Sequence, residues 1–483
     1  MTDTPFIRTV LAAWLLGLVG ACTNPAGNGA TLSIVNATLI DGTGAPPRAQ
    51  VTVVIADGRI VNIRSGERRI ARARGAWVDA TGKFLIPGLC DAHAHLVTRE
   101  GFLPLCIANG VTSVRDTGNR LDKLRAWRAD IEAGRLLGPR LIFCGPIVDG
   151  PHSVVGDLAL TVSTAEEGRR SVRDMQRNGA DFIKVYNFLS PEAFRAIADE
   201  AQRAGVPMAG HVPISTSAGE AAEAGQSCIE HLSGVLLACS SDEDRLRAAI
   251  VREIEASEYS PLVTNRLLFS APPIDLVDTY SPDRAAVLFQ RFVELGTRHV
   301  PTLVVLRNIA DQETGRIQAD ARLRYLPARI RDDWRRPRFA GRSVDEIIAC
   351  QAVYRKHMEL VGQMHRAGVA ILAGTDTPNW VLPGFGLHEE LELLVEAGLT
   401  PMEALRSATA LPAEFLRRPD LGTIAVGQLA DMVLLDADPL ADIRNTQTIR
   451  AVIVRGQFLD RDQLDALLAE AERAAGATQS ARR

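Results

Sequence analysis

The chain has 483 residues, of which 46% are hydrophobic, and its formal net charge is −4. This length allows one large domain and a smaller one, because a single α/β barrel takes about 250 residues. The small net charge and the lack of a dense Lys/Arg block in the sequence exclude a nucleic-acid partner.

The first residues have the layout of an export signal. A short polar start is followed by the apolar run "TVLAAWLLGLVGA" and then by Cys22. The run is too short to span a bilayer, because a membrane helix needs about 20 apolar residues. It therefore predicts a signal peptide over residues 1–22. Since the start region is only weakly basic, a plain cleaved signal and an uncleaved anchor remain alternatives.

The end of this segment, "LVGAC", is similar to a bacterial lipoprotein lipobox. In a lipobox the cysteine becomes the acylated first residue of the mature chain. The similarity implies an exported protein, periplasmic or at the cell surface, that is held at the membrane by lipid on Cys22.

A linker rich in Gly, Ala, Asn and Pro follows over residues 23–31. Short β-type runs with Asp-Gly turn signals come next, and similar runs return near the C-terminus in "DMVLLDADP" and "IRAVIVRGQFL". The two β-rich ends, 32–83 and 412–462, are predicted to form one composite domain of β-sandwich type. Residues 463–483 predict a short helix and a polar tail.

Residues 84–411 alternate apolar strands with helical stretches, which is typical of parallel βαβ units in an α/β protein. The eight strand candidates are "KFLIPGLCDAHAH", "GVTSVRDT", "PRLIFCGP", "DFIKVYN", "VPMAGHV", "SCIEHLSG", "HVPTLVVL" and "VAILAGTD". This number predicts a (β/α)8 TIM barrel, in which catalytic groups gather at the C-terminal ends of the strands. The long connections 235–298 and 307–345 predict extra helices that cap the mouth.

Histidines and an aspartate stand where several of these strands end. Residues i and i+2 of a strand point to the same face, so His93 and His95 can share one metal ion. That pair alone is weak evidence, because two nearby histidines also arise by chance in polar loops. His211, His231 and Asp376 end other strand candidates. Their common position predicts a metal site at the mouth of the barrel.

Lys184 lies in the apolar strand "DFIKVYN". An unpaired ammonium buried there would be unfavourable, so the lysine is expected to lose its proton. A neutral amine can react with carbon dioxide. The carbamate that results has two oxygens and can bridge two cations.

These motifs together resemble the amidohydrolase superfamily, from "TLIDGTGAP" to "AVIVRG". The residues that carry the resemblance stand in "PGLCDAHAHL", "GVTSVRDTG", "ADFIKVY", "GHVP", "IEHL", "AGTDTPN" and "GTIAVGQLADMVLLDADP". The set looks most like the imidazolonepropionase-like and Xaa-Pro-dipeptidase-like branch. It departs from that branch at "YNFLS" and "GHVP", so substrate specificity is not carried over.

The resemblance implies two divalent metal ions. Zinc is favoured by the ligand types, and manganese, cobalt or iron could occupy the same positions. Six residues would hold the ions: His93, His95 and Asp376 the first, His211 and His231 the second, and carboxylated Lys184 both. A hydroxide bridging the ions would attack the substrate, and Asp376 would pass its proton to the departing nitrogen.

The expected reaction is hydrolysis of a C–N amide bond in a small molecule, either a dipeptide or an N-acyl amino acid. A lactonase or phosphotriesterase-like hydrolase with the same binuclear site is the alternative. Lys184 argues against a mononuclear deaminase or imidazolonepropionase, and the complete ligand set argues against a lipoprotein that only binds. A homo-oligomer is compatible with the sequence.

Four other residues are candidates for roles around the site. His152, in "VDGPHSVVGD", either polarises the substrate carbonyl or is an ordinary loop histidine. Tyr186 shares the face of Lys184 and either points into the site or packs in the barrel. Arg115 is expected to form an internal salt bridge, and His388 is expected to cap a helix or to pack in the core.

The cysteines beyond Cys22 contain no CxxC pair, so buried thiols are favoured over a disulfide framework. They are Cys90, Cys106, Cys144, Cys228, Cys239 and Cys350.

Overall fold

The computed structural model describes residues 31–66, 75–270, 275–335 and 342–480. The predicted signal peptide, Cys22 and nearly all of the linker lie outside these ranges, so export and lipid anchoring stay predictions. Within them, no helix combines the length and the apolar character that a membrane span requires.

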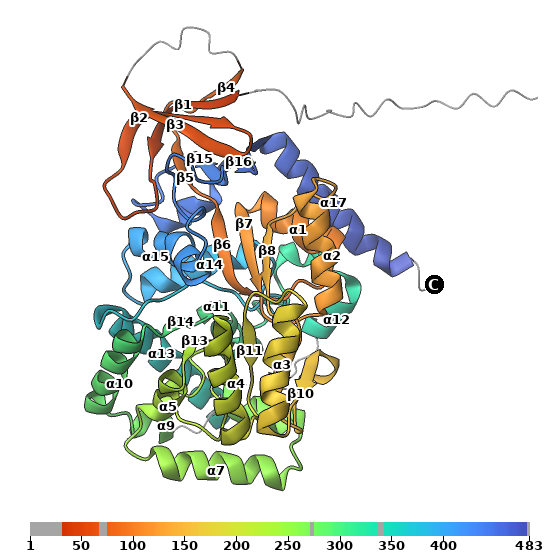
Figure 1. Cartoon of the computed structure of the whole chain (residues 1–483), viewed down its shortest axis with the longest axis vertical. Coiled ribbons are helices and arrows are strands. Elements are labelled where there is room, and N and C mark those ends of the chain that lie inside the picture. The colour runs from red at the N-terminus through yellow and green to blue at the C-terminus, as the bar shows by residue number, and fades with distance from the viewer. Residues whose placement is uncertain (1–30, 67–74, 271–274, 336–341, 481–483) are drawn as a thin grey trace, which may run out of the picture.

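Strands from both ends of the chain form one eight-stranded sheet (Figure 1). They are β1 (Thr31–Leu39), β2 (Arg48–Ala56), β3 (Arg59–Ser65), β4 (Ala76–Asp79), β5 (Phe84–Pro87), β15 (Met432–Leu435), β16 (Ile449–Val454) and β17 (Gln457–Asp460). The antiparallel pair β5–β15 joins the two ends. Alternate residues such as Ile34, Val53 and Leu434 form its apolar core. The β-sandwich form predicted for this domain stays a prediction.

The first strand candidate of the predicted barrel is divided at Gly88. Its beginning is β5 of the terminal sheet, and its remainder is β6 (Leu89–Ala94). A Cβ atom at Gly88 would lie 2.1 Å from Thr112 Oγ1, so only glycine fits where the chain passes from one sheet to the other.

The middle of the chain forms two parallel sheets. The first contains β6, β7 (Val111–Asp116) and β8 (Arg140–Phe143). The second has the order β10-β9-β11-β12-β13-β14, with bounds Ala159–Thr161, Ile147–Asp149, Ile183–Val185, Met208–Gly210, Gln226–Glu230 and Arg298–Val300. Helices α1 (Arg99–Ala108), α2 (Leu121–Glu132), α3 (Ala165–Arg177), α4 (Pro191–Ala204) and α5 (Ala218–Glu223) alternate with the strands. The protein is therefore of the α/β class, with parallel sheets.

The strand predicted over 299–306 is shorter than expected. Only β14 is extended, and Leu303–Ala310 form helix α11. The Glu390 side chain accepts hydrogen bonds from the backbone N–H groups of Leu303 and Val304 at 3.0 and 2.8 Å. These contacts satisfy two of the backbone N–H groups that have no partner within the first turn of a helix. They therefore favour a helix over a continued strand at this point.

The strand predicted over 369–376 is also absent as a regular strand. This segment makes isolated parallel bridges, from Ile371 to His299 on β14 and from Thr377 to Ala94 on β6. Backbone hydrogen bonds of 2.7 to 3.0 Å, such as that from Ala92 N to Ala373 O, accompany the bridges. The segment therefore lies between the first strand and the last strand of the two parallel sheets.

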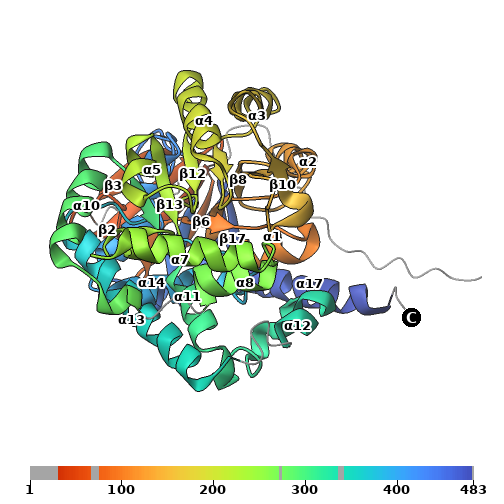
Figure 2. The ribbon, with the colours of Figure 1, turned by 90° about the horizontal axis from the view of Figure 1, so that it is seen from below.

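Two long connections supply extra helices, as predicted. The first contains α6 (Val235–Ala238), α7 (Glu243–Ala256), α8 (Pro261–Asn265), the π-helical turn η2 (Arg266–Ser270), α9 (Asp275–Asp278) and α10 (Pro282–Leu295). The second begins with α11 and includes α12 (Ala328–Arg335), before α13 (Val344–Arg366). Viewed from below, α7 and α8 lie in front of the parallel strands (Figure 2). Helices α14 (Phe385–Glu396), α15 (Pro401–Ser407) and α16 (Ala410–Phe415) lead back to the terminal sheet.

The C-terminal helix is longer than the sequence predicts. Helix α17 spans Arg461–Ser480 and packs along α1. Its residue Leu464 is fully buried, and Ala471 contacts Leu105 of α1 and Tyr325. Apolar residues at helical spacing therefore attach this helix to the body of the protein, and residues 481–483 of the predicted tail lie outside the described ranges.

Replacing Leu464 by alanine should lower the free energy of unfolding by about 2–5 kcal/mol, because it leaves a cavity in the hydrophobic core. Urea unfolding followed by circular dichroism measures the change. The control, Glu470→Ala, alters an exposed residue of the same helix and should stay within about 0.5 kcal/mol of the wild type. An equal effect of both variants would contradict the packing described.

Candidate metal centre

Two histidines converge on one carboxylate oxygen at the end of β6. His93 Nε2 and His95 Nε2 each lie 3.2 Å from Asp376 Oδ1. Ligand atoms of the three residues all lie within 4.8 Å of one another. Asp376 has a φ of 59°, so a left-handed turn follows the bridged segment at this residue. The three side chains predicted to bind the first ion are thus brought together.

The other two predicted histidines adjoin this group. His211 follows β12 and His231 follows β13, with their ring centroids 4.9 Å apart. The His231 ring lies 4.5 Å from that of His93. His231 has a φ of 57°, so its side chain does not follow the alternation of side chains between the two faces of β13. Four imidazoles therefore share one small volume.

Three of the histidines have a hydrogen-bond partner at Nδ1: Gly118 O for His95 at 3.1 Å, Asn187 Oδ1 for His211 at 2.9 Å, and Thr302 Oγ1 for His231 at 2.7 Å. The Thr302 hydroxyl in turn donates to Pro301 O, so it can accept from the His231 ring. Partners of this kind fix the tautomer and leave Nε2 as the ligand atom.

The burial of His93 tests whether a metal ion fits here. Its side chain is fully buried, yet neither ring nitrogen makes a hydrogen bond to any described residue. Buried polar atoms without a partner are unfavourable, and a cation would satisfy them. Burial, with a smaller effect of Lys184, lowers the pKa of His93 to about 3, so the ring is neutral, as metal ligation requires. The donor set suits zinc.

Asp376 is held in its ionised form. Burial by itself would raise its pKa, but the neighbouring His231, His93 and His95 together keep the pKa well below its usual value. A carboxylate in this position can act as a ligand and as a proton acceptor.

Lys184 is buried on β11, as predicted, but it is not unpaired. Its Nζ contacts a carboxylate oxygen of Glu230 at the end of β13, and the other oxygen accepts from Arg115 Nη2 at 2.7 Å. The sequence argument that the ammonium lacks a partner is therefore wrong. Burial, assisted by Arg115, still lowers the pKa of Lys184 to about 7, so its neutral amine is accessible.

Glu230 is the site residue that the sequence analysis missed. It is fully buried, and its Oε2 lies 3.4 Å from His93 Nδ1. Together with His93 and His231 it forms a second group with metal-ligand geometry. The available signal was a carboxylate two residues after Cys228, on the inward face of an apolar strand. The internal salt bridge predicted for Arg115 is confirmed, and Glu230 is its partner.

A chamber of about 730 Å³ opens over these residues. Tyr186 lines it, with its ring centroid 4.0 Å from that of His211, so this side chain does point into the site. Burial raises the pKa of Tyr186, so the phenol keeps its proton. Exposed residues of the extra helices also line the chamber, including Leu262 of α8 and Arg329 of α12.

The remaining candidates lie away from the metal ligands. His152 does not line the chamber, and its ring stacks on Tyr259 with centroids 3.6 Å apart, so its catalytic role stays a prediction. His388 packs in the core, where its ring nitrogens contact Thr446 Oγ1 and Asn109 O at 2.9 and 3.0 Å.

The six described cysteines are free and buried, as expected.

The sequence is similar to a known family and to other proteins. The model of the amidohydrolase family matches residues 84–256 and 308–459. An uncharacterised protein of Mycobacterium tuberculosis is 24% identical over 86% of this chain and 94% of its own length.

Two solved structures are similar in fold. A putative prolidase from Bifidobacterium longum is 27% identical, covers 92% of this chain and 99% of its own, and superposes with a TM-score of 0.63. A bottromycin amidohydrolase is 25% identical, covers 92% of this chain and 91% of its own, and gives a TM-score of 0.72. The family match covers most of the chain and includes every predicted metal ligand, and we conclude that the chain belongs to the amidohydrolase family.

Proposed function

We propose that the protein is a metal-dependent hydrolase that cleaves a C–N amide bond in a dipeptide or an N-acyl amino acid. The observation that carries this proposal is the convergence of His93 and His95 on Asp376 Oδ1, at 3.2 Å each. Hydrolysis of an amide is also the activity that the name of bottromycin amidohydrolase indicates.

The proposal includes the closed (β/α)8 barrel. The hydrogen bonds that seat segment 369–377 between β6 and β14 support closure on one side. On the other side, Asp181 N donates to Phe143 O, which brings the start of β11 beside β8. In such a barrel the carboxyl ends of the strands meet around one opening, where the histidines lie.

Two divalent ions, for which zinc is favoured, would be held by His93, His95 and Asp376 and by His211 and His231. When bound, such ions polarise a carbonyl and lower the pKa of water. The ionised Asp376 accepts a proton and hands it to the departing nitrogen. Tyr186, which lines the chamber and keeps its proton, would donate from its hydroxyl to the substrate carbonyl.

Lys184 is proposed to be carboxylated on Nζ and to contact both ions. The lowered pKa of its amine favours the neutral form that reacts with carbon dioxide. After carboxylation Nζ keeps one N–H, which can donate to Glu230, its present contact. The Glu230–Arg115 pair would then hold the carboxylated lysine in a fixed orientation.

Arg329 supports a substrate with a free carboxylate, as dipeptides and N-acyl amino acids have. Its exposed side chain lines the chamber, and no acidic side chain of the described residues pairs with it. A guanidinium in that position can bind a carboxylate by two parallel hydrogen bonds. Export with a lipid on Cys22 and assembly as a homo-oligomer also remain part of the proposal.

Replacing Lys184 by alanine should remove bound metal and abolish amide hydrolysis together. Elemental analysis of the purified protein should give two zinc ions per wild-type chain and less than one in the variant. Lys356→Ala, a change on the outer helix α13, is the control. A Lys184→Ala protein that kept both ions and its activity would eliminate the carbamate. Hydrolysis of lactones or phosphotriesters, but not of dipeptides or N-acyl amino acids, would contradict amide hydrolysis and favour the alternative activity.

Replacing Arg329 by alanine should raise KM about tenfold for N-acyl amino acids, because a charged hydrogen-bond donor is lost at a solvated position. The corresponding N-acyl amino acid amides, which lack the carboxylate, should show the same KM with both enzymes. Arg335→Ala, at the exposed end of the same helix, is the matched control. An equal change for acids and amides would refute the role of Arg329.

A further inference from the structure

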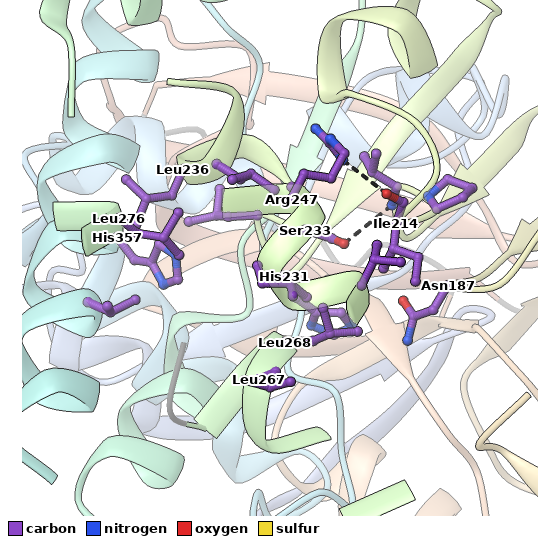
Figure 3. A pocket seen from close by; sticks show the side chains of 18 of the residues that line it. Asn187, Ile214, His231, Ser233, Leu236, Arg247, Leu267, Leu268, Leu276 and His357 are labelled. Atoms are coloured by element: carbon purple, nitrogen blue, oxygen red, sulfur yellow. Dashed lines mark hydrogen bonds between the residues drawn. The ribbon is translucent and has the colours of Figure 1, made fainter. Parts of the chain in front are cut away.

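A second cavity has His231, one of the predicted metal ligands, in its wall (Figure 3). It has a volume of about 90 Å³ and shares two wall residues, His231 and Leu306, with the catalytic chamber. By the same measure one water needs about 10–15 Å³, so several waters or a short carbon chain would fit. Its position places any occupant next to the imidazole of His231.

The walls of this cavity are mostly aliphatic. They include Leu236 of α6, Ile250 of α7, Leu267 of η2, Leu276 of α9 and Val353 of α13, all buried. Most of the polar side chains at the wall already have partners or carry no charge. Aliphatic walls favour an apolar occupant over an ion.

The charged wall residue, Arg247, illustrates this. Its guanidinium donates to the backbone oxygens of Ile214 and Thr216 at 3.2 and 2.8 Å, and to Glu243 at 2.5 Å. The positive charge of Arg247 is therefore already paired with Glu243 and two backbone oxygens. Burial lowers the pKa of His357 to about 4, so that ring is neutral at physiological pH. An anion would therefore find no free positive partner among the described wall residues.

One polar group at the wall is left unsatisfied. Asn187 is 1% exposed, and its Oδ1 accepts from His211, but its amide nitrogen Nδ2 has no hydrogen-bond partner among the described residues. A buried donor of this kind is unfavourable unless an acceptor arrives. Because Asn187 contacts a predicted metal ligand, an acceptor bound to Nδ2 would lie close to the reacting bond.

Part of the wall lies outside the segments that match the family model. Leu267, Leu268 and Leu276 lie between the two segments that match the family, 84–256 and 308–459. The residues that shape the cavity therefore include a stretch that the family pattern does not define.

We propose that this cavity is the subsite for an aliphatic acyl group of the amide substrate. The Asn187 amide nitrogen donates to an oxygen of the substrate at the inner end of that group. The inference rests on the proposed amide hydrolysis and narrows it to N-acyl amino acids with an aliphatic acyl chain longer than acetyl.

The first test is a series of one amino acid acylated with chains from acetyl to hexanoyl. For the wild type, kcat/KM should rise about threefold per added methylene, because each is removed from water. In Val353→Phe the larger ring fills the cavity, so the preference for hexanoyl over acetyl should fall about tenfold. Val353→Ile, a smaller change, should lower it less and serves if the first variant does not fold.

Val344→Phe is the matched control, since Val344 is 71% exposed on the same helix α13. It should leave the preference unchanged. A flat series in the wild type, or an equal preference in Val353→Phe and the wild type, would overturn the subsite.

A second measurement does not depend on turnover. Calorimetric titration should show that hexanoate binds the metal-loaded protein at least tenfold more tightly than acetate, and that Val353→Phe removes the difference. If no amide is hydrolysed but this difference is found, the subsite stands and the proposed function fails. If amides are hydrolysed and hexanoate binds no better than acetate, the subsite fails alone.

Asn187→Asp tests the polar end of the cavity. This variant keeps the oxygen that accepts from His211 but removes the amide donor. Bound metal should be retained, while KM for the hexanoyl substrate rises about tenfold. Retained metal with unchanged KM would contradict the contact proposed for Nδ2.

Discussion

The candidate metal centre depends on the burial of several ligand-type side chains in one small volume. His93 is fully buried with two ring nitrogens that make no hydrogen bond to the described residues, and Asp376 carries a negative charge beside it. A shared cation would satisfy these buried groups together. The hydrogen bonds at Nδ1 of His95, His211 and His231 fit that arrangement, because each leaves Nε2 as the ring nitrogen that can bind a metal ion.

The parallel strands explain how residues so distant in sequence meet. Each strand runs in the same direction, so each delivers its last residues to the same side of the sheets. Left-handed backbone at His231 and Asp376 departs from the strand pattern at the positions where chemistry is placed. Such departures are common at functional sites. The extra helices then line the chamber and supply Arg329 and much of the wall of the aliphatic cavity.

Much of the site could be predicted because the two-residue period of a strand applies to His93 and His95 without tertiary information. Glu230 was missed because the next residue, His231, was taken as the ligand at the end of this strand, whereas the partners that hold Glu230 at the site, Arg115 and Lys184, come from other strands. The segment 299–306 was mistaken for one strand because a buried helix and a buried strand are both apolar. The capping carboxylate, Glu390, comes from a helix more than 80 residues away in the sequence.

Anomalous X-ray diffraction at the zinc edge, from crystals of the protein grown with zinc, tests the central claim most directly. The account predicts two peaks, one between His93, His95 and Asp376 and one beside His211 and His231, with continuous density from Lys184 to both. A single peak held by His93, Glu230 and His231, or no peak within reach of the four imidazoles, would contradict it.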